Sequence, residues 1–388
     1  MMMRILIVLT YYKPYKSGLT IYAARQAQAL AAMGYDVTVL TSQFDPDLPE
    51  YEDDQGVQIV RLPVAFRLSK GVIMPKILST AWKLIGQSDI INLHLPQGDA
   101  ALVAIFTKIR SKPLVSTYHC DIKMPGGVIN TLAGWGAALS NHISVSLSDA
   151  VVQNTRDFAE HSNFLERYLK KLTVIQPPIV VDPVSEKEIT QFVRKFEIDP
   201  SRKIIGMVAR LASEKGVEYL VDAVPEVLEG FDTAQVIFVG NYQNVIGEQA
   251  YKEKILPMIE RLGDRWKFLG IISEAEKAAF YSLCDVLVLP SINSTESFGM
   301  VQVEGMTCGT PVVATDLPGV RQPVLSSGMG KIVPVKNPHA LAEGIIAVLK
   351  SSNRLDDKKV NALKDHYSPE TVAKEYENLY QKLMESNG

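Results

Sequence analysis

Short apolar runs alternate with longer segments of helical periodicity along the chain. Residues 4–10 form the first run, and residues 19–33 repeat their apolar positions at helical spacing until Gly34 ends the pattern. Further strand-like runs in the first half lie at residues 37–41, 57–62, 89–94, 113–119 and 149–154. Strands that alternate with helices in this way predict a parallel, doubly wound sheet.

The same alternation restarts after residue 200 and predicts a second sheet of this kind. A helix is expected at residues 216–228, and strands are expected at residues 203–209, 235–240, 266–269, 285–289, 311–315 and 330–335. Between the halves, the prolines of residues 173–183 exclude a helix and stiffen the connection. We therefore expect an α/β protein with Rossmann-like domains at residues 1–183 and 184–367.

The final segment, residues 368–384, is expected to be a helix that begins with a Ser-Pro-Glu cap. Its apolar side chains share one face, which consists of Val372, Tyr376, Leu379, Tyr380 and Leu383.

Composition narrows the class of protein. The chain has 388 residues, of which 47% are hydrophobic and 21% charged, as in ordinary globular proteins. A net charge of −3 argues against a general nucleic-acid binder. The three cysteines, Cys120, Cys284 and Cys308, are isolated, which fits a reducing cytoplasm. The apolar start is too short to span a membrane and lacks a cleavage site, so it is expected to be the first strand.

Two common nucleotide motifs are missing from the sequence. No GxGxxG follows the first strand, which disfavours a dinucleotide dehydrogenase, and no Walker A sequence occurs. Asp45 and Asp47 flank Pro46 in a loop, where turn-forming acids are common. We interpret them as a turn and expect no obligatory metal or cofactor.

Residues 285–320 carry the strongest functional signal. A buried strand, a polar turn, a helix expected from Phe298 and a second buried strand follow one another. The backbone N–H groups of Ser297, Phe298, Gly299 and Met300 would be unpaired at such a helix start and could hold a phosphate.

Glu296 and Glu304 flank this expected phosphate site. At helical rise, eight residues separate them by about 12 Å, which suits a nucleotide sugar with hexose at one carboxylate and ribose at the other. The alternative is that Glu296 only complements the helix dipole and Glu304 is a solvated helix residue.

Arg210 and Lys215 follow the first strand of the second half. Parallel sheets bind ligands beyond the carboxyl ends of their strands, so both cations would face a ligand there and neutralise a diphosphate. The alternative is a solvated loop, although positive charge at a helix start is mildly unfavourable.

These segments resemble the donor site of the family 4 retaining glycosyltransferases of the GT-B fold. The resemblance rests on Glu296, Phe298-Gly299, Glu304 and residues 309–314, and Arg210 and Lys215 resemble the diphosphate-binding pair of that family. It implies two Rossmann-like domains that face a cleft, with the final helix crossing back onto the first domain. It also implies that a hexose moves from a UDP-sugar or GDP-sugar to an acceptor with retention of configuration. Substrate binding is then expected at Ser297, Phe298, Gly299, Met300, Val301 and Glu304.

Weaker resemblances extend the expected site. Gly18 stands alone where the family usually has a glycine pair, and His119 with Asp121 resembles a Thr-x-His-Asp element into which Cys120 is inserted. The resemblance places His119 beside the transferred sugar, whereas a buried structural histidine is the alternative. Ile271 and Ile272 match a segment that brackets the base through backbone groups, and this pattern does not distinguish uracil from guanine.

Residues 66–87 contain a basic amphipathic segment. Six apolar side chains repeat at helical spacing on one face: Met74, Ile77, Leu78, Ala81, Trp82 and Ile85. Lys76 and Lys83 lie off that face, and Arg67 and Lys70 precede it. Such a helix could rest on an anionic membrane, but packing on the first sheet is the favoured interpretation.

We therefore expect a glycosyltransferase whose catalytic residues are His119, Glu296, Arg210 and Lys215. Its partners would be a nucleotide-sugar donor and a saccharide or lipid-linked acceptor, without nucleic acid. It would be cytoplasmic, with peripheral association at the cytoplasmic membrane face if the amphipathic helix binds lipid. The alternatives are a nucleotide-sugar epimerase of the same fold and a catalytically silent nucleotide-sugar-binding protein.

Overall fold

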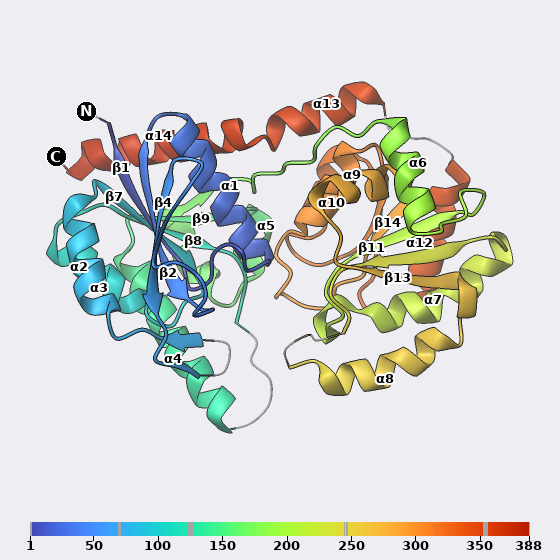
Figure 1. Cartoon of the computed structure of the whole chain (residues 1–388), viewed down its shortest axis with the longest axis horizontal. Coiled ribbons are helices and arrows are strands. Elements are labelled where there is room, and N and C mark those ends of the chain that lie inside the picture. The colour runs from blue at the N-terminus through green and yellow to red at the C-terminus, as the bar shows by residue number, and fades with distance from the viewer. Residues whose placement is uncertain are drawn as a thin grey trace. The chain divides into compact units, whose positions relative to one another are not determined.

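A computed structural model describes residues 2–68, 71–122, 128–243, 245, 247–351 and 356–387. It divides into two compact units, which we call unit 1 (residues 1–178 and 367–388) and unit 2 (residues 179–366). Each unit is built on one large, mainly parallel sheet with helices packed on it (Figure 1). The expected doubly wound α/β class is therefore confirmed in both halves of the chain.

The sheet of unit 1 has eight strands in the order β10-β9-β8-β7-β1-β2-β4-β3. Only β3 runs antiparallel to its neighbour. The strands are β1 (Arg4–Val8), β2 (Asp36–Gln43), β3 (Tyr51–Asp54), β4 (Val57–Pro63), β7 (Ile90–Leu95), β8 (Leu114–Tyr118), β9 (Ala150–Gln153) and β10 (Leu172–Val174). A separate hairpin joins β5 (Phe66–Leu68) to β6 (Gly71–Ile73).

The helices of unit 1 are α1 (Gly18–Ala32), α2 (Ile77–Gln87), α3 (Ala100–Ile109), α4 (Val128–Leu147), α5 (Arg156–His161), the 3-10 helix η1 (Leu165–Lys171) and α14 (Pro369–Asn387). Ser17 caps α1 by accepting a hydrogen bond from the Thr20 N–H, and Gly34 ends the turn beyond it with a φ of 93°. The final helix, α14, packs against α1 and buries Tyr376 and Tyr380, which confirms that the chain returns to its first domain (Figure 1).

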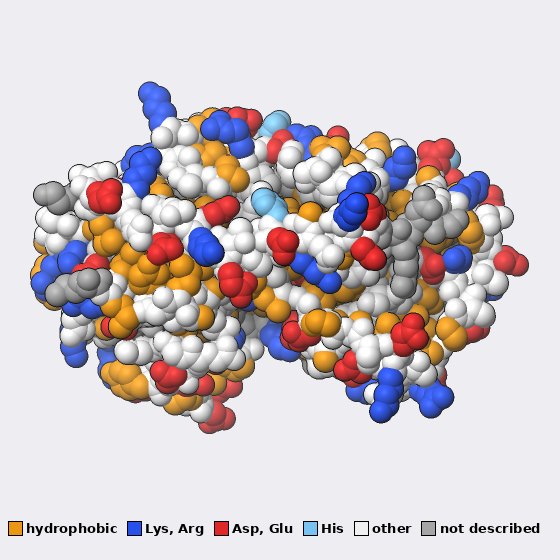
Figure 2. All heavy atoms as spheres, turned by 90° about the horizontal axis from the view of Figure 1, so that it is seen from above, with side chains coloured by type: hydrophobic (Ala, Val, Ile, Leu, Met, Phe, Trp, Pro, Cys, Tyr) orange, Lys and Arg blue, Asp and Glu red, His pale blue; other side chains and the backbone are white. Residues whose placement is uncertain are grey.

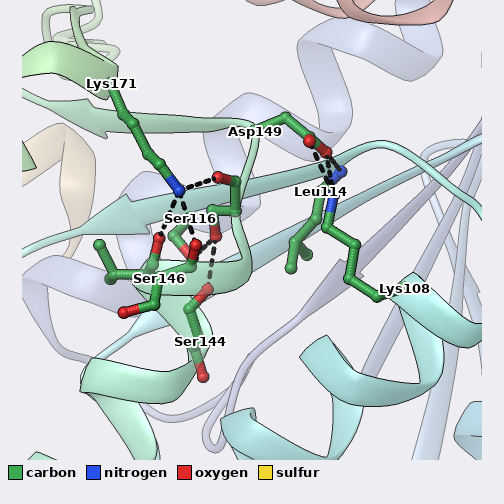
Figure 3. A network of polar contacts seen from close by, with 9 residues as sticks. Lys108, Leu114, Ser116, Ser144, Ser146, Asp149 and Lys171 are labelled. Carbon is green, nitrogen blue, oxygen red and sulfur yellow. Dashed lines mark hydrogen bonds and ion pairs between the residues drawn. The ribbon is translucent and has the colours of Figure 1, made fainter. Parts of the chain in front are cut away.

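A polar network fixes the end of α4 against the sheet of unit 1 (Figure 3). Lys171 donates hydrogen bonds to the carbonyl oxygens of Ser146 at 2.6 Å and Ser148 at 2.7 Å, where the helix leaves carbonyl groups unpaired. Asp149 accepts from Lys108 and from the N–H of Leu114, at the start of β8. These bonds set where β8 and β9 begin, and therefore where their carboxyl ends present side chains.

The sheet of unit 2 has six parallel strands in the order β13-β12-β11-β14-β15-β16. They are β11 (Ile204–Val208), β12 (Gln235–Val239), β13 (Trp266–Gly270), β14 (Val286–Leu289), β15 (Val312–Thr315) and β16 (Gly330–Val333). All four side chains of β14 are buried, because a parallel strand is covered on both faces.

Helices cover both faces of this second sheet, and each face has its own apolar core. The helices are α6 (Glu186–Lys195), α7 (Val217–Gly230), α8 (Gln249–Glu260), α9 (Glu274–Leu283), α10 (Met300–Thr307), α11 (Gln322–Ser327), α12 (Pro338–Ser351) and α13 (Asp357–His366), with the 3-10 helices η2 (Ser213–Lys215) and η3 (Gly263–Arg265).

Four short strands of unit 1 were not expected from the sequence. The β3 strand reads YEDD and gains its place by pairing with β4, although acidic residues are poor strand formers. The β5–β6 hairpin has three residues in each strand, too few for a periodic signal. Because β10 includes Thr173 and Val174, the first part of the proline-containing connection is an edge strand.

Candidate functional site

The loop between β14 and α10 places the segment with the strongest sequence signal. The helix begins at Met300, with Gly299 as its N-cap at a φ of 77°, a conformation that favours glycine. The expectation of a helix from Phe298 is therefore wrong by two residues. Ser297 and Phe298 lie in the loop. The N–H groups that this helix start leaves without intrahelical partners belong to Gly299, Met300 and Val301, since the N–H of Gln302 donates to the carbonyl oxygen of Gly299 at 3.0 Å.

Lys215 and Glu296 form an ion pair in unit 2. Their side chains meet at 2.6 Å, with exposed fractions of 18% and 17%. They come from loops that follow β11 and β14, which are neighbours in the sheet, so the carboxyl ends of parallel strands bring them together. Arg210 lies in the first of these loops and pairs with Glu214 at 2.9 Å.

Gly216 allows these two loops to pack closely. A Cβ atom at this position would lie 2.2 Å from the carbonyl oxygen of Pro290, and the residue has a φ of 65°. The N–H of Ile292 also donates to the carbonyl oxygen of Glu214 at 3.0 Å. The loop with Lys215 is therefore fixed by backbone contacts to the loop that leads to Glu296.

Glu304 lies on α10 and is 3% exposed, so it is not the solvated residue of the alternative interpretation. Its Oε2 atom accepts a hydrogen bond from the Tyr281 hydroxyl at 2.8 Å, and Lys277 lies 3.9 Å from the same atom. Burial, together with this carboxylate, raises the pKa of Tyr281, so that the hydroxyl keeps its proton and donates. Glu296 stands outside the helix, so the spacing of about 12 Å expected from helical rise does not apply.

Sequence reasoning missed Tyr281 and Lys277 because both lie on α9, about 25 residues before Glu304, with no motif to mark them. After β13, Ile271 is 67% exposed whereas Ile272 is buried. Ser273 begins α9 with a capping box, which fixes the backbone of this turn.

In unit 1, His119 follows β8 and pairs with a second buried histidine that sequence reasoning missed. Nε2 of His119 lies 2.9 Å from Nδ1 of His94, and the rings stack with centroids 5.1 Å apart. Burial lowers the pKa of His119 to about 3 and the pKa of His94 well below its usual value. Both rings are therefore neutral near pH 7. The missed signal was positional, since His94 is the second-last residue of one parallel strand and His119 directly follows the neighbouring strand.

Two further expected residues of unit 1 have structural surroundings that the sequence did not show. Gly18 is the first residue of α1, and a Cβ atom there would have no other atom within 4 Å, so the fold itself does not require glycine. Asp121 accepts hydrogen bonds from the hydroxyls of Ser162 at 2.6 Å and Tyr118 at 3.1 Å.

The amphipathic stripe of residues 66–87 divides between core and surface. Four of its members are buried: Met74, Ile77, Ala81 and Ile85. Leu78 and Trp82 are 50% and 38% exposed, and Trp82 contacts Phe106 and the guanidinium of Arg110. Lys70 lies outside the described residues.

Within the described parts of the chain, no group of three or more His, Cys, Asp or Glu residues could hold a metal ion. Asp45 accepts a hydrogen bond from the N–H of Asp47 at 3.1 Å, the contact of a turn. The described helices include none that is long and apolar enough to cross a bilayer.

Two doubly wound units, with a cation–carboxylate pair beside a glycine-capped helix start in the second, are the features of a nucleotide-dependent α/β enzyme. Comparison with known families identifies the class more closely. The model of "Glycosyl transferases group 1" matches residues 188–365, and that of "Glycosyl transferase 4-like domain" matches residues 17–177.

Similar proteins match over most of the chain. An uncharacterized glycosyltransferase of Methanocaldococcus jannaschii is 29% identical over 402 residues, with 100% of both chains covered. The phosphatidyl-myo-inositol mannosyltransferase of Mycobacterium leprae is 27% identical over 90% of this chain and 88% of its own. Among solved structures, Anabaena HepE in complex with UDP has a TM-score of 0.75 at 19% identity, covering 98% of this chain and 100% of its own.

The chain belongs to the group 1 glycosyltransferases of family 4 and has the GT-B fold. It is a glycosyltransferase that uses a nucleotide sugar.

Proposed function

We propose that this enzyme transfers a hexose from UDP-hexose or GDP-hexose to a lipid or lipid-linked saccharide, with retention of the anomeric configuration. The observation that carries the proposal is the pairing of Lys215 with Glu296 beside the start of α10. The cation and the carboxylate lie 2.6 Å apart, so they can bind adjacent parts of one nucleotide sugar. The cation would contact phosphate oxygens, and the carboxylate would accept hydrogen bonds from sugar hydroxyls.

In this proposal the diphosphate binds at the N–H groups of Gly299, Met300 and Val301, with Ser297 and Phe298 in the loop beside it. Lys215 and Arg210 neutralise the charge that the leaving diphosphate gathers as its bond to the hexose breaks. Glu296 accepts from hexose hydroxyls, Glu304 accepts from ribose hydroxyls, and the backbone at Ile271 and Ile272 borders the base.

The chemical step follows from the absence of an assigned nucleophile in this set. The bond between C1 of the hexose and the β-phosphate oxygen breaks while the acceptor oxygen attacks C1 on the same face. The acceptor proton passes to the leaving phosphate oxygen, which Lys215 and Arg210 stabilise. His119, being neutral, serves as a hydrogen-bond partner for a hexose hydroxyl, and Gly18 leaves room for substrate near the start of α1.

A lipid acceptor is proposed from the surface of unit 1. The helices α2, α3 and α4 pack side by side and expose large apolar side chains. These are Leu78, Trp82, Leu102, Ile105, Ile109, Trp135 and Leu139. Figure 2, which looks onto another side of the molecule, also shows apolar side chains gathered in the half of the visible face that unit 1 occupies, with both basic and acidic side chains around them. An apolar surface with nearby Arg110 and Lys83 suits an anionic bilayer at the cytoplasmic face. The Mycobacterium leprae relative is itself named for a phosphatidylinositol acceptor.

The proposal is tested by incubating the enzyme with radiolabelled UDP-glucose or GDP-mannose and membrane lipid extract. Transfer of label to a lipid product with the donor's anomeric configuration, read by NMR, is the expected result. A changed hexose without any acceptor would instead identify an epimerase, and binding without turnover would identify a silent binding protein.

The membrane part has its own measurement, co-sedimentation with anionic vesicles. Changing Arg67, Lys70, Lys76 and Lys83 to Glu should remove most binding, since each cation near such a surface contributes about 1 kcal/mol. Equal binding by the folded variant would leave α2 as ordinary core packing.

A further inference from the structure

One face of the unit 1 sheet carries four polar side chains beneath α1 and α14. Asn92 and His94 are two residues apart on β7, while Thr117 lies on β8 and His119 directly follows that strand. Side chains two residues apart share a face of a sheet, so the four lie on one face, and the pairing of His94 with Thr117 brings the strands into register. All four are buried and need hydrogen-bond partners.

Tyrosines of the final helix supply several of those partners. The Tyr376 hydroxyl lies 2.8 Å from that of Tyr22 and 3.1 Å from Oγ1 of Thr117. One turn further along α14, the Tyr380 hydroxyl accepts from Asn92 at 2.8 Å and from Gln26 at 3.2 Å. Both tyrosines are 0% exposed, so water does not substitute for these bonds.

The direction of the bonds through Tyr376 follows from the number of protons available. Thr117 has one hydroxyl proton and donates it to Oδ1 of Asn92 at 2.9 Å. It must therefore accept from Tyr376, whose single proton is then used. Tyr22 must in turn donate to Tyr376. The chain of donors runs from Tyr22 through Tyr376 and Thr117 to Asn92.

Tyr22 connects this chain to the histidine pair. Its ring meets the ring of His119 edge-on, with centroids 4.9 Å apart, and lies 6.0 Å from that of His94. Because its hydroxyl is fixed by Tyr376 at the far end, the ring cannot swing away from the imidazoles without breaking a buried hydrogen bond.

The tautomers of the pair follow from the same accounting. Nε2 of His94 is buried and has no hydrogen-bond partner among the described residues, and an unpaired buried N–H is rarer than an unpaired acceptor. The proton of His94 therefore lies on Nδ1 and is donated to Nε2 of His119. A neutral His119 then carries its own proton on Nδ1.

We propose that Tyr376 of the final helix is a positioning residue for sugar transfer, acting through Tyr22 on His119. The inference rests on the proposed role of His119 beside the hexose. It gives α14 a part in the reaction beyond covering α1. Tyr380, by contrast, has a structural role only, because its hydroxyl bonds to Asn92 and Gln26 and stabilises the fold.

The matched variants are Tyr376→Phe and Tyr380→Phe, each of which removes one buried hydroxyl and keeps the ring. Tyr376→Phe should lower kcat about tenfold with an unchanged KM for the donor, because misplacement near the reacting groups affects turnover more than nucleotide binding. Tyr380→Phe should keep at least half of kcat. It leaves the side-chain N–H donors of Asn92 and Gln26 unpaired and should therefore lower the free energy of unfolding as much as Tyr376→Phe does. An equal fall of kcat in both variants would overturn the proposal.

A second measurement needs no turnover. In protein with ¹⁵N-labelled histidine, the ring resonances of His119 should shift in Tyr376→Phe and stay in place in Tyr380→Phe. Unchanged His119 resonances in a folded Tyr376→Phe protein would also overturn the proposal. Absence of sugar transfer by the parent would sink the proposed function alone, because this spectrum would still decide whether Tyr376 acts on His119.

Discussion

Unit 2 presents paired charges that solvent can reach, and unit 1 presents neutral polar side chains that are buried. Lys215 and Glu296 keep nearly a fifth of their side-chain surface exposed, whereas His94 is 1% exposed. A charged ligand loses less of its hydration at the first kind of site than at a fully buried one, because solvent still reaches the charges there. The second kind orients groups through shape and hydrogen bonds. In the proposed reaction, unit 2 therefore supplies binding energy for the diphosphate and unit 1 supplies orientation.

The largest effect should come from removing the cation of unit 2. Lys215→Ala should lower the rate of transfer about 100- to 1,000-fold, as loss of one preorganised electrostatic contact does. Lys195→Ala is the control, since Lys195 pairs with Glu276 at 2.5 Å on the surface of the same unit and should leave the rate intact. Steady-state kinetics with the identified donor compares the two, and similar rates would break the assignment of charge to unit 2.

Packing of the two loops provides the next test. Gly216→Ala should destabilise the protein by about 3 kcal/mol or more, because the new Cβ meets a backbone carbonyl and the φ of 65° is strained for alanine. Gly309→Ala has a similar φ of 83° but nothing within 4 Å of its Cβ, so it should cost only about 1–2 kcal/mol. Urea denaturation measures both, and equal losses would show that the close approach to Pro290 is unimportant.

Acid should weaken unit 1 through its histidines. Burial lowers the pKa of His94 and His119 from 6.5, so the unfolded chain takes up protons first as the pH falls. Their contribution to stability is complete above pH 6.5 and declines below it, by at most about 1.4 kcal/mol per pH unit for each histidine.

Urea denaturation at pH 7, 6 and 5 measures this slope before most carboxylates titrate. A folded His94→Asn variant should show a smaller slope than the parent, while His142→Asn, at an exposed position, should keep it. Identical slopes in all three proteins would mean that the buried pair does not control the acid response.

The smallest effect distinguishes the two carboxylates of unit 2. Glu304→Gln should weaken binding of UDP or GDP about tenfold. The amide that replaces the buried carboxylate has one acceptor oxygen, for which the Tyr281 hydroxyl and the ribose hydroxyls then compete. Glu296→Gln should instead lower turnover and leave nucleotide affinity nearly unchanged. Calorimetric titration with the nucleotide separates them, and equal loss of affinity would contradict the division of roles.

The elements that the sequence predicted well are those whose pattern is local. The run VLVL of β14 is buried on both faces, and both the Ser-Pro-Glu start and the apolar stripe of the final helix appear in α14. Strands such as β3 depend on a partner strand, and no window of its own residues predicts it. Which residues of two such strands pair with each other is decided by the folded sheet and cannot be predicted from either strand alone.

The same limit applies to the candidate site. Lys215 could be singled out because it lies in the loop that follows a predicted strand, and Glu296 because it stands just before a predicted helix start. Their ion pair could not, since it depends on Gly216 packing against Pro290. Tyr281 and His94 escaped notice because a tyrosine or histidine on an apolar element has no signature until its partner is in place.

The return of α14 to unit 1 has a consequence for the order of synthesis. Asn92 and Thr117 are hydrogen-bonded to Tyr380 and Tyr376, which are synthesised about 200 residues later than the rest of unit 1. At ordinary translation speeds this delay is on the order of ten to forty seconds. During that interval Asn92 and Thr117 of the nascent first domain lack their partners on α14. A chain truncated before residue 367 would lack them permanently, and we expect chaperones and proteases to recognise it.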